Sequence, residues 1–337
     1  MANQRIVPDH IAHRSALALA LLTTWYLSAL SNTPNMAPSS PSTTASYSIL
    51  PNIFLQSLPA TSPSSFNPLN SSFGLIPRTY PTDPPSSGPP GQQSQWSRLG
   101  SYLRSLNSAS TPQTKIKLLY LARHGEGFHN VAESYYGTSE WNRYWSRLDG
   151  NGTVVWADAR LTETGEGQAQ ELGDAIEVER EGKGMLGPEA WVVSPLWRCL
   201  STAEVTWGRR GWGGEGKVVV RERAREVIGV HTCDRRSTRR EIQAGFRGYR
   251  LEEGLAEEDE WWDPEHRETV EERRARAREL LDQIFFGDDD RAVQVVVSVT
   301  AHSGIIRAIL EVVGHREWPL ETGGMMPVVV KAVQHPK

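Results

Sequence analysis

The sequence is poor in cysteine and has no large excess of charge of either sign. Two cysteines, Cys199 and Cys233, occur in 337 residues. They are too few for a disulfide framework, so we expect two free thiols rather than a bridge. The formal net charge of −4 predicts no general attraction to nucleic acid or to an acidic membrane surface. Affinity for an anion must therefore come from a local pocket.

Long hydrophobic runs are also scarce. An apolar run from Ala16 to Leu30 follows several basic residues but is shorter than the ~20 residues of a membrane-spanning helix. For residues 1–30 we therefore expect a signal peptide or anchor-like segment; the alternatives are a disordered N-terminal extension or a mistaken start codon. A membrane partner is expected only if residues 16–30 act as an anchor. We expect a cytoplasmic protein, with the secretory route as the alternative.

Residues 31–95 differ in composition from the rest of the chain, because Ser, Pro and Thr dominate them. Such a segment buries too little apolar surface to offset the entropy of ordering it. We therefore expect residues 31–95 to be disordered, with Phe73-Gly74-Leu75-Ile76 as a local apolar patch that packs on the domain. The globular domain is then expected to span residues 96–337.

Strand-like and helix-like segments alternate in the domain. Short apolar runs predict strands at 116–121, 191–194, 217–220, 293–300 and 328–330. Helical spacing and capping residues predict helices over 95–107, 161–181, 195–207, 268–286 and 305–313. This alternation predicts an α/β fold, a three-layer sandwich in which helices flank a mainly parallel sheet.

Unusual polar groups follow three of these strands. They are Arg123-His124-Gly125, the segment from Ser194 to Arg198, and Ala301-His302-Ser303-Gly304. Ligands bind open parallel sheets beyond the carboxyl ends of the strands, and helix N-termini at that edge attract anions. We therefore expect two histidines and two arginines to meet at one edge of the sheet.

These residue types suit a phosphomonoester. Arginine gives a dianion permanent charge and multidentate hydrogen bonds. A neutral imidazole can attack phosphorus and form a phosphohistidine, and neighbouring arginines would lower the pKa of His124 and favour that neutral form. A second histidine, His302, could donate to the phosphoryl oxygens. The leaving alcohol needs a proton, so the mechanism also needs a carboxylic acid.

Together the motifs resemble those of the histidine phosphatase superfamily, the phosphoglycerate-mutase-like proteins. The resemblance depends on Arg123-His124-Gly125, on the Ser-Pro-Leu-x-Arg-x-x-x-Thr-Ala pattern that begins at Ser194, and on His302-Ser303-Gly304. It covers residues 116–330. Segments 135–138, 156–159 and 225–237 are similar to those of a fungal branch of mutase-like phosphatases.

The resemblance implies roles for individual residues. His124 would be the phosphorylated histidine and His302 the second histidine of the site. Arg123, Asn130 and Arg198 would bind the phosphoryl group together with His302. Glu226 would be the general acid, although Glu222 and Asp234 are close in sequence and stay open as alternatives.

The expected activity is hydrolysis of a small phosphorylated substrate through phosphohistidine, without a cofactor and with the oligomeric state open. A phosphomutase is one alternative. Phe128-His129 and the insert 133–159 are unlike a compact glycolytic mutase and count against it. A pseudoenzyme that binds phosphate is the other alternative.

Two further clusters invite a functional interpretation. His231, Cys233 and Asp234 could ligate a metal, but no second ligand pair occurs at zinc-like spacing, so we expect no metal site. A basic cluster contains Arg235, Arg236, Arg239 and Arg240. We expect a solvated, ion-paired face there, with a wall that recognises further phosphates or carboxylates as the alternative.

Overall fold

The computed structural model describes residues 44–84, 93–213, 216–287 and 294–335. The predicted signal or anchor segment, residues 1–30, lies outside these ranges. Within the described residues, no helix is both long enough and apolar enough to cross a bilayer.

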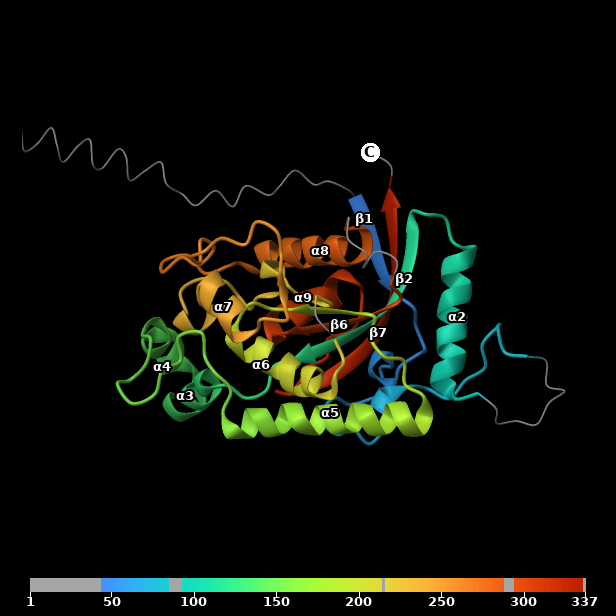
Figure 1. Cartoon of the computed structure of the whole chain (residues 1–337), viewed down its shortest axis with the longest axis horizontal. Coiled ribbons are helices and arrows are strands. Elements are labelled where there is room, and N and C mark those ends of the chain that lie inside the picture. Colours follow the sequence, from blue (N-terminus) through green and yellow to red (C-terminus); the bar gives the residue numbers. More distant parts are fainter. Residues whose placement is uncertain (1–43, 85–92, 214–215, 288–293, 336–337) are drawn as a thin grey trace, which may run out of the picture. The chain divides into compact units, whose positions relative to one another are not determined.

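A seven-stranded sheet in the order β1-β7-β2-β6-β3-β4-β5 forms the centre of the fold (Figure 1). Its strands in this order are Thr44–Ile49, Met325–His335, Thr114–Arg123, Val296–Ala301, Ala190–Val193, Val218–Val220 and Arg250–Leu251. The five strands from β2 to β5 are parallel, whereas β7 is antiparallel to both β1 and β2. The expected α/β fold with a mainly parallel sheet is confirmed.

Successive side chains of a strand point to opposite faces of the sheet, and they form one hydrophobic core on each face. Leu118 and Tyr120 of β2 pack with the helices α2 (Gln95–Ala109), α5 (Glu163–Lys183) and α6 (Trp197–Thr206). Leu119 and Leu121 point to the opposite face, where they pack with α8 (Val270–Phe286) and α9 (Ser303–Val312). Figure 1 shows α5 and α6 on one side of the sheet and α8 and α9 on the other. The layers are those of the predicted three-layer sandwich.

The expectation that residues 31–95 are disordered is wrong for residues 44–84. β1 pairs with β7 from Thr44, opposite His335, to Ile49, opposite Val330. The 3-10 helices η1 (Leu55–Ser57) and η2 (Ser72–Gly74) follow, and Ile53 and Phe73 are buried in the core. The predicted apolar patch at 73–76 does pack on the domain, since Phe73 and Leu75 are buried in its core, whereas β1 and Ile53 were not predicted. The described domain therefore begins at residue 44 rather than 96.

The segment after β2 forms a small helical subdomain. It contains α3 (Phe128–Tyr136), α4 (Thr138–Arg143) and η3 (Trp145–Arg147). Trp141 and Trp156 pack edge to face at its centre, 5.4 Å apart, and Cys233 of η6 (Thr232–Asp234) joins the same cluster. This aromatic core fixes the insert against the segment that carries η6.

Three short elements complete the described structure. They are η4 (Gly208–Arg210), η5 (Glu222–Ala224) and α7 (Arg239–Gly245). Of these, η5 directly precedes the predicted acid Glu226.

Candidate active site

Three neighbouring strands end level at one edge of the sheet. The register places Arg123 of β2 opposite Ala301 of β6, and Val193 of β3 opposite Thr300 of β6. The residues that follow these strands therefore meet, and the ring centroids of His124 and His302 are 5.0 Å apart.

A cavity of about 250 Å³ opens at this edge. Its lining includes the predicted residues Arg123, His124, Asn130, Arg198 and Glu226. The sequence thus predicted five residues of one cavity from four separate segments.

His124 is buried, and its hydrogen bond shows which ring nitrogen carries the proton. Nδ1 lies 2.7 Å from the carbonyl oxygen of Gly125, which can only accept, so Nδ1 is the donor. Nε2 of a neutral ring then keeps its lone pair. Burial, followed by the charges of Arg198 and Arg123, lowers the pKa of His124 well below its ordinary value. The ring is therefore a neutral base at neutral pH.

Gly125, directly after His124, lies where the backbone of another segment leaves no room for a side chain. A β-carbon on Gly125 would come within 2.2 Å of the carbonyl oxygen of Gly165 at the start of α5. The backbone N–H of Gly125 donates to Oγ1 of Thr202, at 3.0 Å. No other residue type fits at this position without a shift of the backbone.

Arg198 is fully buried and is held from three sides. Its Nε donates to Nδ1 of His302 at 3.2 Å, and one terminal nitrogen donates to the carbonyl oxygen of Cys233 at 2.6 Å. The other terminal nitrogen pairs with Asp234 at 2.9 Å. These bonds fix the plane of the guanidinium at the cavity.

His302 has a different surrounding from the one the sequence suggested. Because Nδ1 accepts from Arg198, Nε2 carries the proton and donates to Oγ of Ser194 at 2.8 Å. Burial and the charge of Arg198 lower the pKa of His302 well below its ordinary value. His302 is absent from the cavity lining, so in this conformation it holds Arg198 rather than pointing an N–H into the cavity.

Arg123 and Asn130 present donors to the cavity. Arg123 donates through one terminal nitrogen to the carbonyl oxygen of Leu320, at 2.9 Å. Its Nε is buried and has no hydrogen-bond partner within the described part of the chain. Oδ1 of Asn130 accepts from the backbone N–H of Gly127 at 3.0 Å, so the NH2 group of its side chain is the remaining donor.

The carboxylate of Glu226 sits at the N-terminus of α9. Oε1 accepts from its neighbour Val227 at 3.0 Å, and Oε2 accepts from Oγ of Ser303 at 3.2 Å and from N–H of Gly304 at 3.1 Å. The group lines the same cavity as His124. The carboxylate and the imidazole of His124 are therefore open to the same space.

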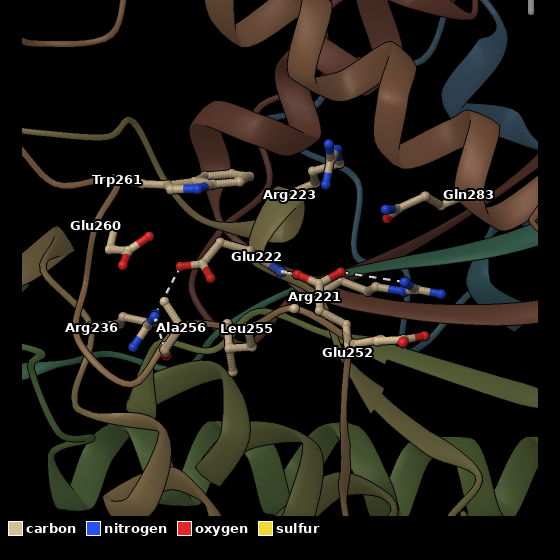
Figure 2. Close-up of a pocket in the computed structure, with 12 residues that line it drawn as sticks. Arg221, Glu222, Arg223, Arg236, Glu252, Leu255, Ala256, Glu260, Trp261 and Gln283 are labelled. Atoms are coloured by element: carbon tan, nitrogen blue, oxygen red, sulfur yellow. Dashed lines mark hydrogen bonds and ion pairs between the residues drawn. The ribbon is translucent and has the colours of Figure 1, made fainter. Parts of the chain in front are cut away.

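The two alternative acids are committed to other contacts. Glu222 is buried and pairs with Arg225 and Arg236, and it lines a separate cavity of about 190 Å³ (Figure 2). Asp234 lines the histidine cavity, but its oxygens pair with Arg198 and Arg267. Although burial raises it, the charges of Arg267 and Arg198 hold the pKa of Asp234 below its ordinary value. The geometry favours Glu226 among the three.

Several side chains that line the cavity were given no role in the site by the sequence analysis. They are His129, Glu133, Trp141, Asn142, Arg267 and Ser303. Arg267 lies far along the chain from the other arginines of the cavity, Arg123 and Arg198, and it is held by the carbonyl oxygens of Val227 and Gly229 at 2.8 and 2.6 Å. No local motif marks it, because these partners are set by the tertiary fold.

Ion pairs occupy parts of both further clusters. Ligand atoms of His231, Cys233 and Asp234 lie within 4.8 Å of one another, yet the two guanidiniums already bound to Asp234 oppose a cation there. In the basic cluster, Arg235 pairs with Asp149 and Arg236 is buried against Glu222. None of the four arginines of that cluster lines the histidine cavity.

A neutral histidine between arginines, at the carboxyl edge of an α/β sheet, defines a class of enzymes that bind phosphoryl groups. Residues 119–328 match the family model of the histidine phosphatase superfamily (branch 1). The chain belongs to this superfamily, whose members are phosphatases or mutases.

In addition to the family model, individual known proteins are similar to this chain. A protein of Arthroderma benhamiae named "Probable phosphoglycerate mutase" is 43% identical over 288 residues, which is 85% of this chain and 84% of the relative. The "Phosphomutase-like protein 3" of Candida albicans is 40% identical over 215 residues, 64% of this chain and 65% of the relative. Among solved structures, "Mycobacterial hydrolase 1" is 22% identical, with a TM-score of 0.39 over 66% of this chain and 98% of that one.

Proposed function

We propose that the protein hydrolyses phosphomonoesters of small molecules through a phosphohistidine formed on Nε2 of His124. The observation that carries the proposal is the bond from Nδ1 of His124 to the carbonyl of Gly125, which leaves Nε2 as the nucleophilic nitrogen. The depressed pKa of His124, caused by burial and by two arginines, keeps that lone pair available.

In the first step Nε2 attacks phosphorus and the bond from phosphorus to the ester oxygen breaks. Glu226, in its acid form, gives its proton to that oxygen as it leaves. Arg123, Arg198 and the amide of Asn130 hold the phosphoryl oxygens and stabilise the charge that develops on them. His302 keeps the guanidinium of Arg198 in place through the bond to Nε.

In the second step the Glu226 carboxylate takes a proton from water, and the oxygen of that water attacks phosphorus. The bond between phosphorus and Nε2 breaks, inorganic phosphate leaves, and His124 returns to its neutral form. The cavity of about 250 Å³ suits a small phosphorylated substrate rather than a folded phosphoprotein segment.

The direct test is hydrolysis of p-nitrophenyl phosphate without added metal, with labelled phosphate trapped on the protein during turnover. The His124→Ala variant should show neither hydrolysis nor label. A matched control is His315→Ala, because His315 is also buried and its Nδ1 also lies near the carbonyl oxygen of the following residue, Arg316, at 2.6 Å. Full activity in His124→Ala would rule out the mechanism.

A mutase is the second candidate, supported by the name of the Arthroderma benhamiae relative. A mutase must keep water from the phosphohistidine until the product has turned in the site. A coupled mutase assay, run beside the hydrolysis assay on phosphoglycerate, separates the two activities. Purified protein that binds phosphate but gives neither label nor turnover would instead be a pseudoenzyme.

A further inference from the structure

A buried arginine of α8 lies behind the segment that carries Glu226. Arg276 is 5% exposed and makes a two-bond pair with Glu268: Nε to Oε1 and a terminal nitrogen to Oε2, both at 2.6 Å. Such a fork pair is rigid, because both planar groups are fixed relative to each other.

The remaining N–H groups of Arg276 point to main-chain carbonyls. They donate to the carbonyl oxygen of Arg223 at 2.8 Å, of Arg225 at 2.8 Å and of Glu226 itself at 2.9 Å. Glu226 follows η5 and lies outside any helix or strand. Three backbone carbonyl groups that take no part in the hydrogen bonds of a helix or sheet thus accept their hydrogen bonds from one side chain.

The other end of Glu226 is held by a different helix. Its carboxylate accepts from Ser303 and Gly304 in the first turn of α9. The helices α8 and α9 pack together in the same core cluster. The main chain of Glu226 is thus anchored to one helix and its carboxylate to the neighbouring helix.

We propose that Arg276, together with its partner Glu268, is a positioning residue for the acid Glu226. This proposal rests on the proposed function, in which Glu226 protonates the leaving oxygen. The guanidinium does not line the cavity, and it holds the segment 223–226 through the three carbonyl groups. Without the fork, the segment 223–226 can shift while the nucleophile and the phosphate-binding arginines stay in place. A displacement of about 1 Å is enough to cost about 10²-fold in rate.

The test compares two substrates that differ in their need for the acid. The leaving group of p-nitrophenyl phosphate is a stable anion and departs without a proton, whereas the alkoxide of glycerol phosphate needs one. The quantity measured is kcat/KM, which includes phosphohistidine formation but not its later hydrolysis. For Arg276→Lys we expect kcat/KM on glycerol phosphate to fall about 10- to 100-fold, and on p-nitrophenyl phosphate by less than about threefold.

The control is Arg98→Lys. Arg98 also pairs with a carboxylate, that of Asp83 at 2.7 Å, and also donates to a backbone carbonyl, that of Arg78 at 2.9 Å, but none of these residues lines the histidine cavity. We expect it to affect both substrates equally. If Arg276→Lys does not fold, as judged by circular dichroism, Glu268→Gln gives the same comparison, because it weakens the same fork.

Glu226→Gln separates failure of this proposal from failure of the proposed function. If Glu226 is the acid, this variant loses glycerol phosphate activity selectively. An unchanged ratio of the two substrates in Glu226→Gln overturns the acid assignment and with it the positioning role. A changed ratio in Glu226→Gln, with an equal effect of Arg276→Lys on both substrates, overturns only the role of Arg276.

Discussion

Gly304 and Glu226 approach so closely that a side chain on the glycine would displace the carboxylate. A β-carbon on Gly304 would lie 2.0 Å from Oε1 of Glu226, and the N–H of Gly304 donates to Oε2 at 3.1 Å. The glycine of the His302-Ser303-Gly304 motif therefore makes room for the acid and also binds it.

Gly304→Ala should accordingly misplace Glu226 while the fold persists. We expect kcat/KM for an alkyl phosphate to fall about 10- to 100-fold, within the range that a general acid contributes. Steady-state kinetics on glycerol phosphate check this. Gly187→Ala is the control, since a β-carbon there meets no atom within 4 Å, and it should keep full activity. Equal rates for the two variants would contradict the steric argument.

Arg198→Met should raise the pKa of His124. Although burial is the larger cause of the low pKa of His124, the positive charge of Arg198 is the next one, and its removal makes protonation of the ring less unfavourable. NMR titration of labelled histidine in the unliganded enzyme measures the shift directly. The same variant should lose about 10²- to 10³-fold in kcat, because a charged donor to the phosphoryl group is gone. A pKa that stays in place would show that burial alone sets it.

The stability of the protein should fall as the pH drops below about 6.5. Burial, followed by the charge of Arg198, lowers the pKa of His129 and of His302 in the folded state. His124 is lowered by burial, Arg198 and Arg123. The unfolded chain then binds protons at pH values where the folded chain does not, so the free energy of unfolding rises with pH up to the unfolded pKa.

Urea unfolding at pH 7.5 and 5.5 measures this dependence. We expect a lower midpoint at pH 5.5 and a smaller difference in His129→Gln, which removes one of the rings whose pKa is lowered in the folded state. Identical pH dependence in the variant would mean that His129 is not held neutral in the fold.

Phe73→Ala should destabilise the domain by about 3–5 kcal/mol, the usual cost of removing a buried phenylalanine. Phe73 is 0% exposed in the core that it shares with β2 and α2, although it belongs to the Ser/Pro/Thr-rich segment. Phe128→Ala is the matched control, because Phe128 is 37% exposed and its loss should cost less than about 1 kcal/mol. Chemical unfolding of the two variants tests whether residues 44–84 are part of the cooperative unit.

The meeting of Arg123, His124 and Arg198 could be predicted because parallel strands end at a common edge. The apolar runs indicated the strands, and the polar residues that directly follow parallel strands lie at the edge of the sheet where those strands end. The order of the sheet and the antiparallel placement of β7 could not be read in this way, because pairing partners are chosen by the whole fold.

Arg267 and Arg276 could not be predicted as parts of the site. Each is held by backbone carbonyls of residues 223–229. Every residue type has a backbone carbonyl, so the sequence does not show where these acceptors lie. The orientation of His302 could not be predicted for a similar reason, since its tautomer depends on Arg198 and Ser194, which are distant in the sequence. The segment 44–84 was misjudged because composition averages over the few side chains that anchor it.

The pairing of β1 with β7 has a consequence for synthesis on the ribosome. β1 is made early, but its partner, Met325–His335, emerges almost 300 residues later. Until then the nascent chain carries strands with unsatisfied backbone groups, which can pair with other chains. Closure of this long loop carries an entropic cost, so the edge of β1 stays unpaired until β7 has been synthesised and has docked. The unpaired edge of β1 is therefore a place where the nascent chain can associate with other chains before β7 is available.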